Sequence, residues 1–239
     1  MEENNIYLIT AALADPLRLS AVMYLIRQPA SVTEMVNHLE VSQSNLSNHL
    51  AVLKKAGLIK STANGRQKIY ELANAEVAQL IELMLNLQPP SPRREQIIKP
   101  IQFARTCYDH IAGKLGVGIF GALVTNGAIV CSIKPDSTHT KLSRQEVIPG
   151  PNAEIIFRNL GVDVAAVSHG RRQLAFGCLD WTERTPHLGG ALGAALCREF
   201  FERKWIIRKD ASRTIAITPG GKKELHEIIG LDADRLTNQ

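Results

Sequence analysis

Two polar clusters in the second half of the chain carry side chains that can bind a metal ion or react. The first is Arg105-Thr-Cys-Tyr-Asp-His110, and the second runs from Cys178 to His187. Two cysteines and two histidines form an acceptable ligand set for zinc or a softer divalent ion. We therefore predict an effector or metal site from six residues of these clusters: Cys107, His110, Cys178, Asp180, Trp181 and His187.

Other roles remain open for these side chains. Free cysteines are among the most buried residues and single histidines often fill a core, so ordinary packing is one alternative. A redox-reactive cysteine is another, and a small organic inducer bounded by Trp181, His187 and the glycine-rich segment after it is a third. Cys178, Asp180 and His187 could also serve an enzyme as nucleophile and proton-transfer groups, if they are adjacent in space. No Cys-x-x-Cys pair is present to favour metal.

A helix is expected to carry the first cluster. Apolar residues recur at helical spacing over residues 107–115, so Cys107 and His110 would share one helix face. The segment that follows, Gly116-Val-Gly-Ile-Phe-Gly121, matches a dinucleotide-binding fingerprint. That fingerprint requires a strand before it and a helix that starts within it. We predict instead that these glycines let the helix cross a neighbour closely.

The second cluster leads into a segment with the order of a winged helix. Residues 187–204 are predicted as a helix, followed by strands that begin near Trp205 and Arg213 and by a helix over residues 222–229. The outer face of the first of these helices carries only glycine and alanine, which offer nothing to base edges but allow close packing. We therefore predict a winged-helix-like shape that packs or binds ligand and does not read DNA.

A recognition helix is predicted between Ser42 and Gly57. Ser42 is a good N-cap, and Gly57 supplies the left-handed residue that commonly closes a helix. Leu46, Leu50 and Leu53 form one apolar stripe, while the opposite face is polar at its start and basic at its end. Such a face suits a DNA groove, with amides and hydroxyls for base edges and lysines for phosphates.

The flanking segments complete a winged helix-turn-helix. Residues 31–39 predict a short helix joined to the recognition helix by Glu40-Val41. Residues 58–60 and 68–72 predict two strands around Asn64-Gly65, which form the wing. All charged residues from 42 to 70 are basic, which favours a polyanionic partner. We predict nine DNA-binding residues: Gln43, Ser44, Ser47, Asn48, His49, Lys54, Lys55, Arg66 and Lys68.

Residues from about 10 to 85 resemble the ArsR/SmtB family of winged-helix repressors, over about a third of the chain. The resemblance rests on Ala11-Ala-Leu-Ala-Asp-Pro-Leu-Arg18, on the recognition-helix run through Leu58, and on Gly65-Arg66 with Tyr70-Glu-Leu72. It implies a homodimeric repressor that binds double-stranded DNA at an inverted-repeat operator. An inducer is expected to weaken this operator binding. The resemblance also implies dimerisation through the first and last helices of this region, here residues 6–13 and 75–85.

The chain departs from that family where many of its members bind metal. Those members use a cysteine pair in the helix before the recognition helix, or acids and histidines in the last helix. Residues 32–39 contain no cysteine here, and residues 75–87 contain neither histidine nor cysteine. The effector is therefore expected to act through the C-terminal domain.

Length and composition agree with a two-domain regulator. The 239 residues, 45% of them hydrophobic, can form two compact domains, and the net charge of +5 is modest. No apolar run approaches the roughly 20 residues needed to span a bilayer, and the N-terminus lacks the basic region of a signal peptide. We predict a cytoplasmic protein with four mainly reduced cysteines and no membrane partner.

The predicted organisation has three parts: a DNA-binding and dimerisation domain over residues 1–88, a proline-rich linker over residues 89–100, and an effector domain over residues 101–239. The predicted fold class is mainly α with small β wings (α+β), a winged helix-turn-helix followed by a winged-helix-like domain. The predicted function is repression of transcription under the control of an unknown small molecule or metal, without enzymatic activity.

Overall fold

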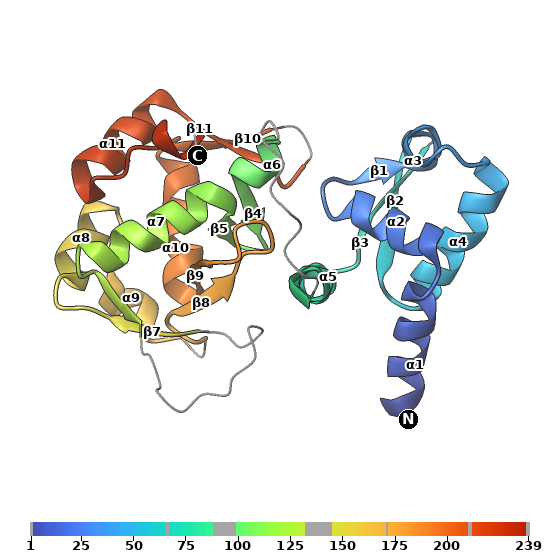
Figure 1. The fold of residues 1–239 in the computed structure, drawn as a ribbon, viewed down its shortest axis with the longest axis horizontal. Coiled ribbons are helices and arrows are strands. Elements are labelled where there is room, and N and C mark those ends of the chain that lie inside the picture. The colour runs from blue at the N-terminus through green and yellow to red at the C-terminus, as the bar shows by residue number, and fades with distance from the viewer. Residues whose placement is uncertain are drawn as a thin grey trace. The chain divides into compact units, whose positions relative to one another are not determined.

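The computed structural model describes residues 2–65, 67–87, 99–131, 145–170, 172–209 and 212–237. The chain divides into two compact units, Met1–Ile81 and Glu82–Gln239 (Figure 1). The division falls inside helix α5 (Ala75–Leu87). Of the predicted linker, residues 89–100, only Lys99 and Pro100 lie within the described residues.

The first unit is a winged helix-turn-helix, as predicted. Its elements before α5 are α1 (Glu2–Leu13), α2 (Pro16–Leu25), β1 (Ala30–Ser31), α3 (Val32–Leu39), α4 (Gln43–Lys55), β2 (Ile59–Asn64) and β3 (Gln67–Leu72). The three strands form an antiparallel sheet in the order β1-β3-β2. Helices α3 and α4 are the helix-turn-helix pair, and the β2-β3 hairpin is the wing.

Local sequence signals fix the ends and the inner face of α4. The Ser42 hydroxyl accepts a hydrogen bond from the Asn45 amide at 3.3 Å, which caps the helix. Gly57, with φ of 72°, follows the last turn in the left-handed conformation that favours glycine. Leu46, Leu50 and Leu53 are at most 1% exposed, which confirms the apolar stripe.

The wing differs slightly from the expected hairpin. Asn64 pairs with Gln67, so Asn64 belongs to the paired part of the hairpin, whereas the sequence predicts a turn at Asn64-Gly65. Arg66, one of the predicted DNA-binding residues, lies outside the described residues.

No single described helix is long and apolar enough to cross a membrane. Only the pair Ile6–Leu13 and Pro16–Leu25, bent by 95°, has sufficient length and apolar composition when taken together. Both helices contribute buried residues to the core of the first unit, among them Leu13 and Leu25.

The second unit is mixed α/β. Beyond α5, its elements are α6 (Pro100–Phe103), β4 (Arg105–Cys107), β5 (His110–Ala112), α7 (Gly113–Thr125), β6 (Ile129–Cys131), β7 (Gln145–Pro149), α8 (Ala153–Asn159), α9 (Val164–Ser168), β8 (Phe176–Leu179), β9 (Pro186–Gly189), α10 (Gly190–Glu202), β10 (Ile206–Arg208), β11 (Ile215–Ile217), α11 (Pro219–Ile229) and the 3-10 helix η1 (Arg235–Thr237). Strands β6-β7-β8-β9 form an antiparallel sheet, and β4-β5 and β10-β11 form hairpins.

This architecture corrects the predicted fold of the C-terminal domain. The expected order of helix, two strands and helix is present as α10, β10, β11 and α11, but it is one part of a larger α/β unit. The helix predicted over residues 107–115 is wrong, because Tyr108 takes a left-handed conformation with φ of 60° and closes the β4-β5 hairpin. The helix predicted from His187 begins only at Gly190, because residues 186–189 pair with β8.

Two segments of this unit repeat one another. His110-Ile-Ala-Gly-Lys-Leu-Gly116 corresponds to His187-Leu-Gly-Gly-Ala-Leu-Gly193. In both, the histidine lies in the second strand of a hairpin, and the helix begins at a glycine, Gly113 or Gly190, with φ of 78° or 87°. A side chain is strained at such a φ, so glycine permits the abrupt change from strand to helix.

The two repeats pack against each other at the starts of their helices. A Cβ atom on Gly116 or Gly193 would lie 2.3 Å from a carbonyl oxygen of the preceding strand. The same atoms would lie 3.4 Å from the Cβ of His187 and 3.2 Å from the Cβ of His110, so each glycine faces the histidine of the other repeat. Of the fingerprint glycines, Gly116 and Gly118 therefore serve close packing as predicted, whereas Gly121 meets no neighbour, and all three lie within a helix that starts at Gly113.

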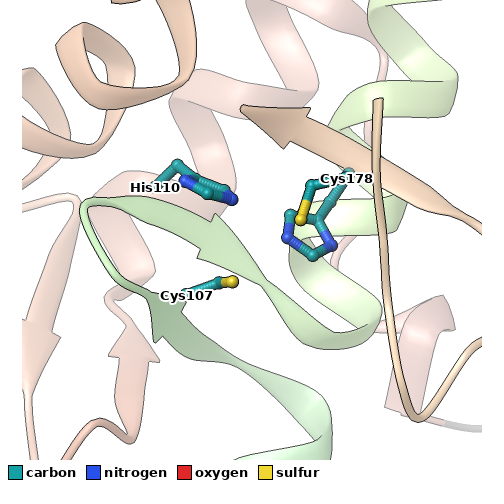
Figure 2. A group of neighbouring side chains, drawn as sticks. Cys107, His110 and Cys178 are labelled. Atoms are coloured by element: carbon teal, nitrogen blue, oxygen red, sulfur yellow. The ribbon is translucent and has the colours of Figure 1, made fainter. Parts of the chain in front are cut away.

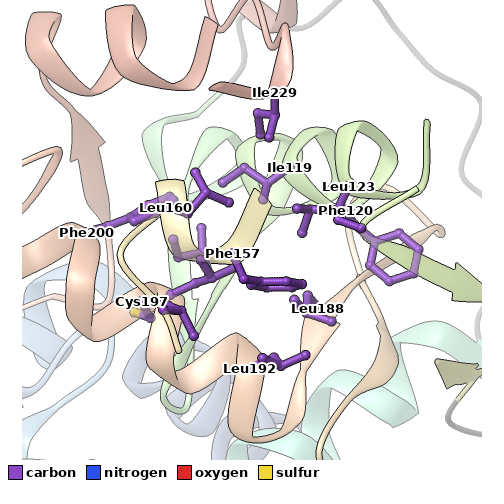
Figure 3. Packing of buried hydrophobic residues seen from close by; sticks show 14 of the residues in the cluster. Ile119, Phe120, Leu123, Phe157, Leu160, Leu188, Leu192, Cys197, Phe200 and Ile229 are labelled. Atoms are coloured by element: carbon purple, nitrogen blue, oxygen red, sulfur yellow. The ribbon is translucent and has the colours of Figure 1, made fainter. Parts of the chain in front are cut away.

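A single hydrophobic core supports this arrangement. Side chains of α7 and α10, including Leu123 and Leu192, meet around Phe157 of α8 (Figure 3). Phe157 and Phe200 have no exposed surface. The repeats are therefore held on a rigid support.

Candidate DNA interface and candidate metal centre

The outer face of α4 presents polar and basic side chains. Gln43, Ser44, Ser47, Asn48 and Lys55 are exposed, opposite the buried leucines. The hydroxyls and amides lie along the first two turns, and the lysines lie in the last turn. This face can present hydrogen-bonding groups to base edges and positive charge to phosphates.

The remaining predicted DNA-binding residues have additional neighbours. Lys54 donates a hydrogen bond to the Ser61 hydroxyl on the wing at 3.0 Å. The Nδ1 atom of His49 lies 3.3 Å from the Asp15 carboxylate, so this ring has a partner within the first unit. Lys68 is exposed on β3. Lys54 thereby connects the recognition helix to the wing.

In the second unit, Cys107, His110, Cys178 and His187 gather in one place. One ligand atom from each residue lies within 4.8 Å of those from the other three. Figure 2 shows Cys107 and His110 on the β4-β5 hairpin, with Cys178 pointing toward them from the opposite strand. Cys107, His110 and His187 are buried, and Cys178 is half-buried. The predicted cluster is present, although its elements differ from those expected.

Cross-strand pairing sets these positions. Cys107 is directly opposite His110 in the β4-β5 hairpin, and Cys178 is directly opposite His187 in the β8-β9 hairpin. Directly opposed residues of antiparallel strands have Cβ atoms about 4.5–5.5 Å apart on the same face of the sheet. Each repeat therefore supplies one sulfur and one imidazole in the same way.

Each histidine has a carboxylate at one ring nitrogen. The Nδ1 atom of His110 lies 3.3 Å from Asp109 Oδ1, and that of His187 lies 3.3 Å from Asp180 Oδ2. The Nε2 atoms of both rings are buried and have no hydrogen-bond partner in good geometry among the described residues. Asp109 accepts a hydrogen bond from Nδ1 of His110, which leaves Nε2 of that ring free to bind a ligand, whereas Nδ1 of His187 is near Asp180 but has no hydrogen-bond partner in good geometry among the described residues.

A buried ion pair anchors Asp180. Arg105 donates to Asp180 Oδ2 at 2.9 Å, and both side chains are fully buried. The Gly113 amide donates to the same oxygen at 2.7 Å, and the Thr182 hydroxyl donates to Oδ1 at 2.6 Å. The Trp181 ring lies against the Arg105 guanidinium, 4.9 Å from its centroid. Burial would raise the pKa of Asp180, but His187 and Arg105 hold it well below its usual value.

Asp109 and Cys107 also have charged neighbours. Arg172 donates to both Asp109 carboxylate oxygens, to Oδ1 at 3.0 Å. Burial opposes the shift, but His110 and Arg172 lower the pKa of Asp109. The Cys107 thiol donates to Glu82 Oε2 at 3.4 Å, and Arg213 donates to Glu82 Oε1 at 3.0 Å.

The pKa of Cys107 argues against a reactive thiolate at that position. The adjacent Cys178 thiol, burial and the Glu82 charge together raise the pKa of Cys107 to about 12. Burial would lower the pKa of His187, but Asp180 and Cys107 raise it to about 9. A reactive cysteine requires a lowered pKa, so Cys107 is a protonated, inert thiol when no ion binds it.

Comparison with known proteins identifies the family. The model of the bacterial regulatory protein, arsR family, matches residues 15–61. The HTH-type transcriptional regulator YdfF of Bacillus subtilis is 34% identical over 225 residues, which cover 91% of this chain and 94% of YdfF. The chain belongs to the ArsR family of helix-turn-helix transcriptional regulators. The match to YdfF spans nearly the whole regulator and so includes a long extension beyond the winged helix.

Shorter relatives match this ArsR-family regulator over little more than a third of its length. CmtR of Mycobacterium tuberculosis is 32% identical over 96 residues, 38% of this chain and 81% of CmtR. The solved structure of HlyU from Vibrio cholerae is 34% identical and covers 36% of this chain and 94% of its own, with a TM-score of 0.34. CmtR is named an HTH-type transcriptional regulator, and HlyU is named a transcriptional activator.

Several residues around the centre of the regulator are absent from the predicted site. Asp109 and Glu82 contact the ligands, Arg172 pairs with Asp109, and Arg105 anchors Asp180. The repeated His-x-x-Gly-x-Leu-Gly pattern is the sequence signal that could have paired the hairpins. Nothing local in the sequence indicates Arg172, whose contact with Asp109 spans 63 residues.

Proposed function

We propose that this regulator is a homodimeric repressor that binds an inverted-repeat operator through α4 and the wing, and whose operator binding is controlled by an effector in the second unit. The exposed face of α4 carries the proposal. Its polar front and basic end form a DNA-reading surface, and residues 42–70 contain no acidic side chain to repel phosphates. Effector control is inferred from the buried polar cluster, since residues 32–39 and 75–87 lack the ligands common in the family.

Substitutions on α4 are expected to separate base reading from phosphate binding. Asn48→Ala should lower the preference for promoter DNA over random duplex by about 1–3 kcal/mol, because a side chain that reads a base edge is removed. Lys55→Ala should weaken binding to both duplexes and reduce the slope of log K against log salt by about 1.8, which is about 0.9 for each subunit of the dimer. Fluorescence anisotropy over a salt series measures both effects.

Lys223→Ala is the matched control, since this exposed lysine lies on α11 and pairs with Glu227. It should bind both duplexes as the unsubstituted protein does. Equal losses from Lys55→Ala and Lys223→Ala, or no preference of the unsubstituted protein for its promoter, would contradict the proposed DNA interface.

A second copy of the chain is the proposed cover for apolar residues of α1. Ile6 and Tyr7 are 65% and 70% exposed, which is unusual for side chains of their size on one helix. We expect Ile6→Asp to shift the protein from dimer to monomer in sedimentation equilibrium, because it places a charge in the interface. Ile155→Asp, at an equally exposed isoleucine of α8, should leave the dimer intact. Identical behaviour of the two variants would refute the α1 interface.

Catalysis is the alternative, because Cys178 is opposite His187 and Asp180 lies 3.3 Å from that histidine. A substrate would need space next to these groups. A cavity lined by Ile111, Gly116, Ile119, Leu188, Gly193 and Leu196 has a volume of about 10 Å³, which is room for one water at most, and none of the three groups lines it. The relatives are also transcriptional regulators. Regulation is therefore the function that the chain supports better.

A further inference from the structure

The buried histidines of the cluster lack the hydrogen-bond partners at Nε2 that buried polar atoms normally have. His187 has no exposed surface and His110 is 4% exposed, yet the Nε2 atoms of both have no hydrogen-bond partner among the described residues. A buried polar group without a partner destabilises the folded state. Two sulfur atoms and one ring nitrogen of each histidine lie within 4.8 Å of one another. The four atoms thus surround a point where a bound cation would satisfy all of them.

We propose that Cys107, His110, Cys178 and His187 bind one divalent ion with tetrahedral preference, zinc or a softer ion of the same geometry. Two nitrogen and two sulfur ligands match the Cys2His2 set of such ions. Tetrahedral zinc holds its ligand atoms about 3.3–3.8 Å apart, so the side chains need to close up by on the order of 1 Å. Binding releases to solvent the two thiol protons and the proton of any ligand imidazole that is charged beforehand, and it transfers no electrons.

The neighbouring carboxylates support this assignment independently. In metal sites, a ligating histidine almost always donates its other ring N–H to a carboxylate, a carbonyl or water, which orients the ring. Asp109 and Asp180 lie 3.3 Å from the Nδ1 atoms of His110 and His187. Arg172 and Arg105 in turn hold these carboxylates in position. His110 therefore has the second partner that a metal ligand requires, and Asp180 lies at the corresponding position beside His187 without a hydrogen bond in good geometry.

The ligand set also indicates the role of the ion. Four protein ligands close the coordination sphere, whereas catalytic zinc sites keep one position open for water. Two thiolates neutralise the charge of a divalent ion, which lowers the cost of its burial. The ion therefore holds the two repeats together and has no position for a substrate.

The centre contacts helix α5 through Glu82. The Cys107 thiol donates to this carboxylate in the absence of an ion, at 3.4 Å. A sulfur bound to the ion has no proton to donate, so occupancy removes this hydrogen bond and places two negatively charged groups side by side. The ion is then the effector that controls operator binding, and it acts on α5 through Glu82. This part of the inference rests on the proposed function.

Titration of the reduced, full-length protein with Co2+ tests the site. We expect one Co2+ per chain, with the intense visible bands of a tetrahedral complex and sulfur-to-cobalt charge transfer, both lost when Zn2+ displaces it. Cys178→Ala should abolish these bands, and Cys178→His should keep a tetrahedral complex with weaker charge transfer. Cys131→Ala removes a half-buried cysteine outside the cluster and should leave the spectrum unchanged.

Circular dichroism of each variant establishes that it is folded before titration. A folded, unsubstituted protein without tetrahedral Co2+ bands would overturn the metal site. Equal loss of the bands in Cys131→Ala and Cys178→Ala would overturn it as well, because Cys131 does not belong to the cluster.

Operator affinity tests the effector role separately. Saturating Zn2+ should change the affinity of the unsubstituted protein for its promoter by about 5- to 150-fold, the usual range of allosteric coupling. The change should vanish in Cys178→Ala and diminish in Glu82→Gln, which still binds Co2+. A protein that binds Co2+ while Zn2+ leaves its operator affinity unchanged would refute the effector role alone. Absence of promoter binding at any Zn2+ concentration would instead refute the proposed function.

Discussion

The Arg105→Ala variant is expected to lose about 3–5 kcal/mol of the free energy of unfolding of the second unit, because breaking a buried ion pair leaves a charge without its partner. Arg105 and Asp180 have no exposed side-chain surface, and their contact is 2.9 Å long. Asp180 would keep its backbone and hydroxyl donors but lose the only guanidinium that contacts it among the described residues. The loss should also misplace His187, which depends on Asp180 for its orientation.

Arg172→Ala provides the matched comparison. This arginine also pairs with a carboxylate beside a ligand histidine, but Arg172 is 40% exposed and Asp109 is 30% exposed. Pairs of this kind contribute about 0–1 kcal/mol. Urea unfolding in the presence of a metal chelator measures both variants without a contribution from bound ions. Similar losses of unfolding free energy from the two substitutions would show that burial does not determine how much the Arg105–Asp180 pair contributes to stability.

Gly116→Ala and Gly121→Ala are expected to change stability in opposite directions, although both lie in α7. A Cβ on Gly116 would lie 2.3 Å from the Ile111 carbonyl oxygen, so the backbone must shift at a cost of about 1–3 kcal/mol. A Cβ on Gly121 meets nothing within 4 Å, and this exposed helical position should gain about 0.5–1 kcal/mol from alanine. Thermal unfolding measures both.

The same pair also reports on the candidate centre. Gly116 faces the Cβ of His187 at 3.4 Å, so Gly116→Ala should displace the histidine and reduce Co2+ binding. Gly121→Ala should bind Co2+ normally. A Gly116→Ala protein as stable as the unsubstituted chain would contradict the close packing of the repeats.

The first unit could be predicted because its signals are local. Ser42, Gly57 and the leucine stripe of α4 lie within one helix and its caps, and each acts on its near neighbours in sequence. The position of the wing was predicted within one residue from Asn64-Gly65. Local propensity and long-range packing agree in this unit, so pattern and structure coincide.

The second unit could be predicted only in part. Its last helix and hairpin were predicted, but the β4-β5 hairpin depends on Tyr108 in a left-handed conformation that no residue preference indicates. The spacing of apolar residues after Cys107 fits a helix, and tertiary pairing overrides it. The types of the four candidate ligands were predicted, whereas their arrangement depends on contacts such as Arg105 with Asp180, which are 75 residues apart.

The candidate centre is assembled from two similar hairpins, which has a consequence for how the chain folds. Each repeat supplies only one sulfur and one imidazole, so neither hairpin alone offers a complete coordination sphere. An ion bound between them would act as a cross-link that closes a long loop of the chain, and such links restrict the unfolded ensemble most when the loop is long. Metal supply would then set the lifetime of the folded extension, so that scarcity of the ion exposes the protein to proteolysis.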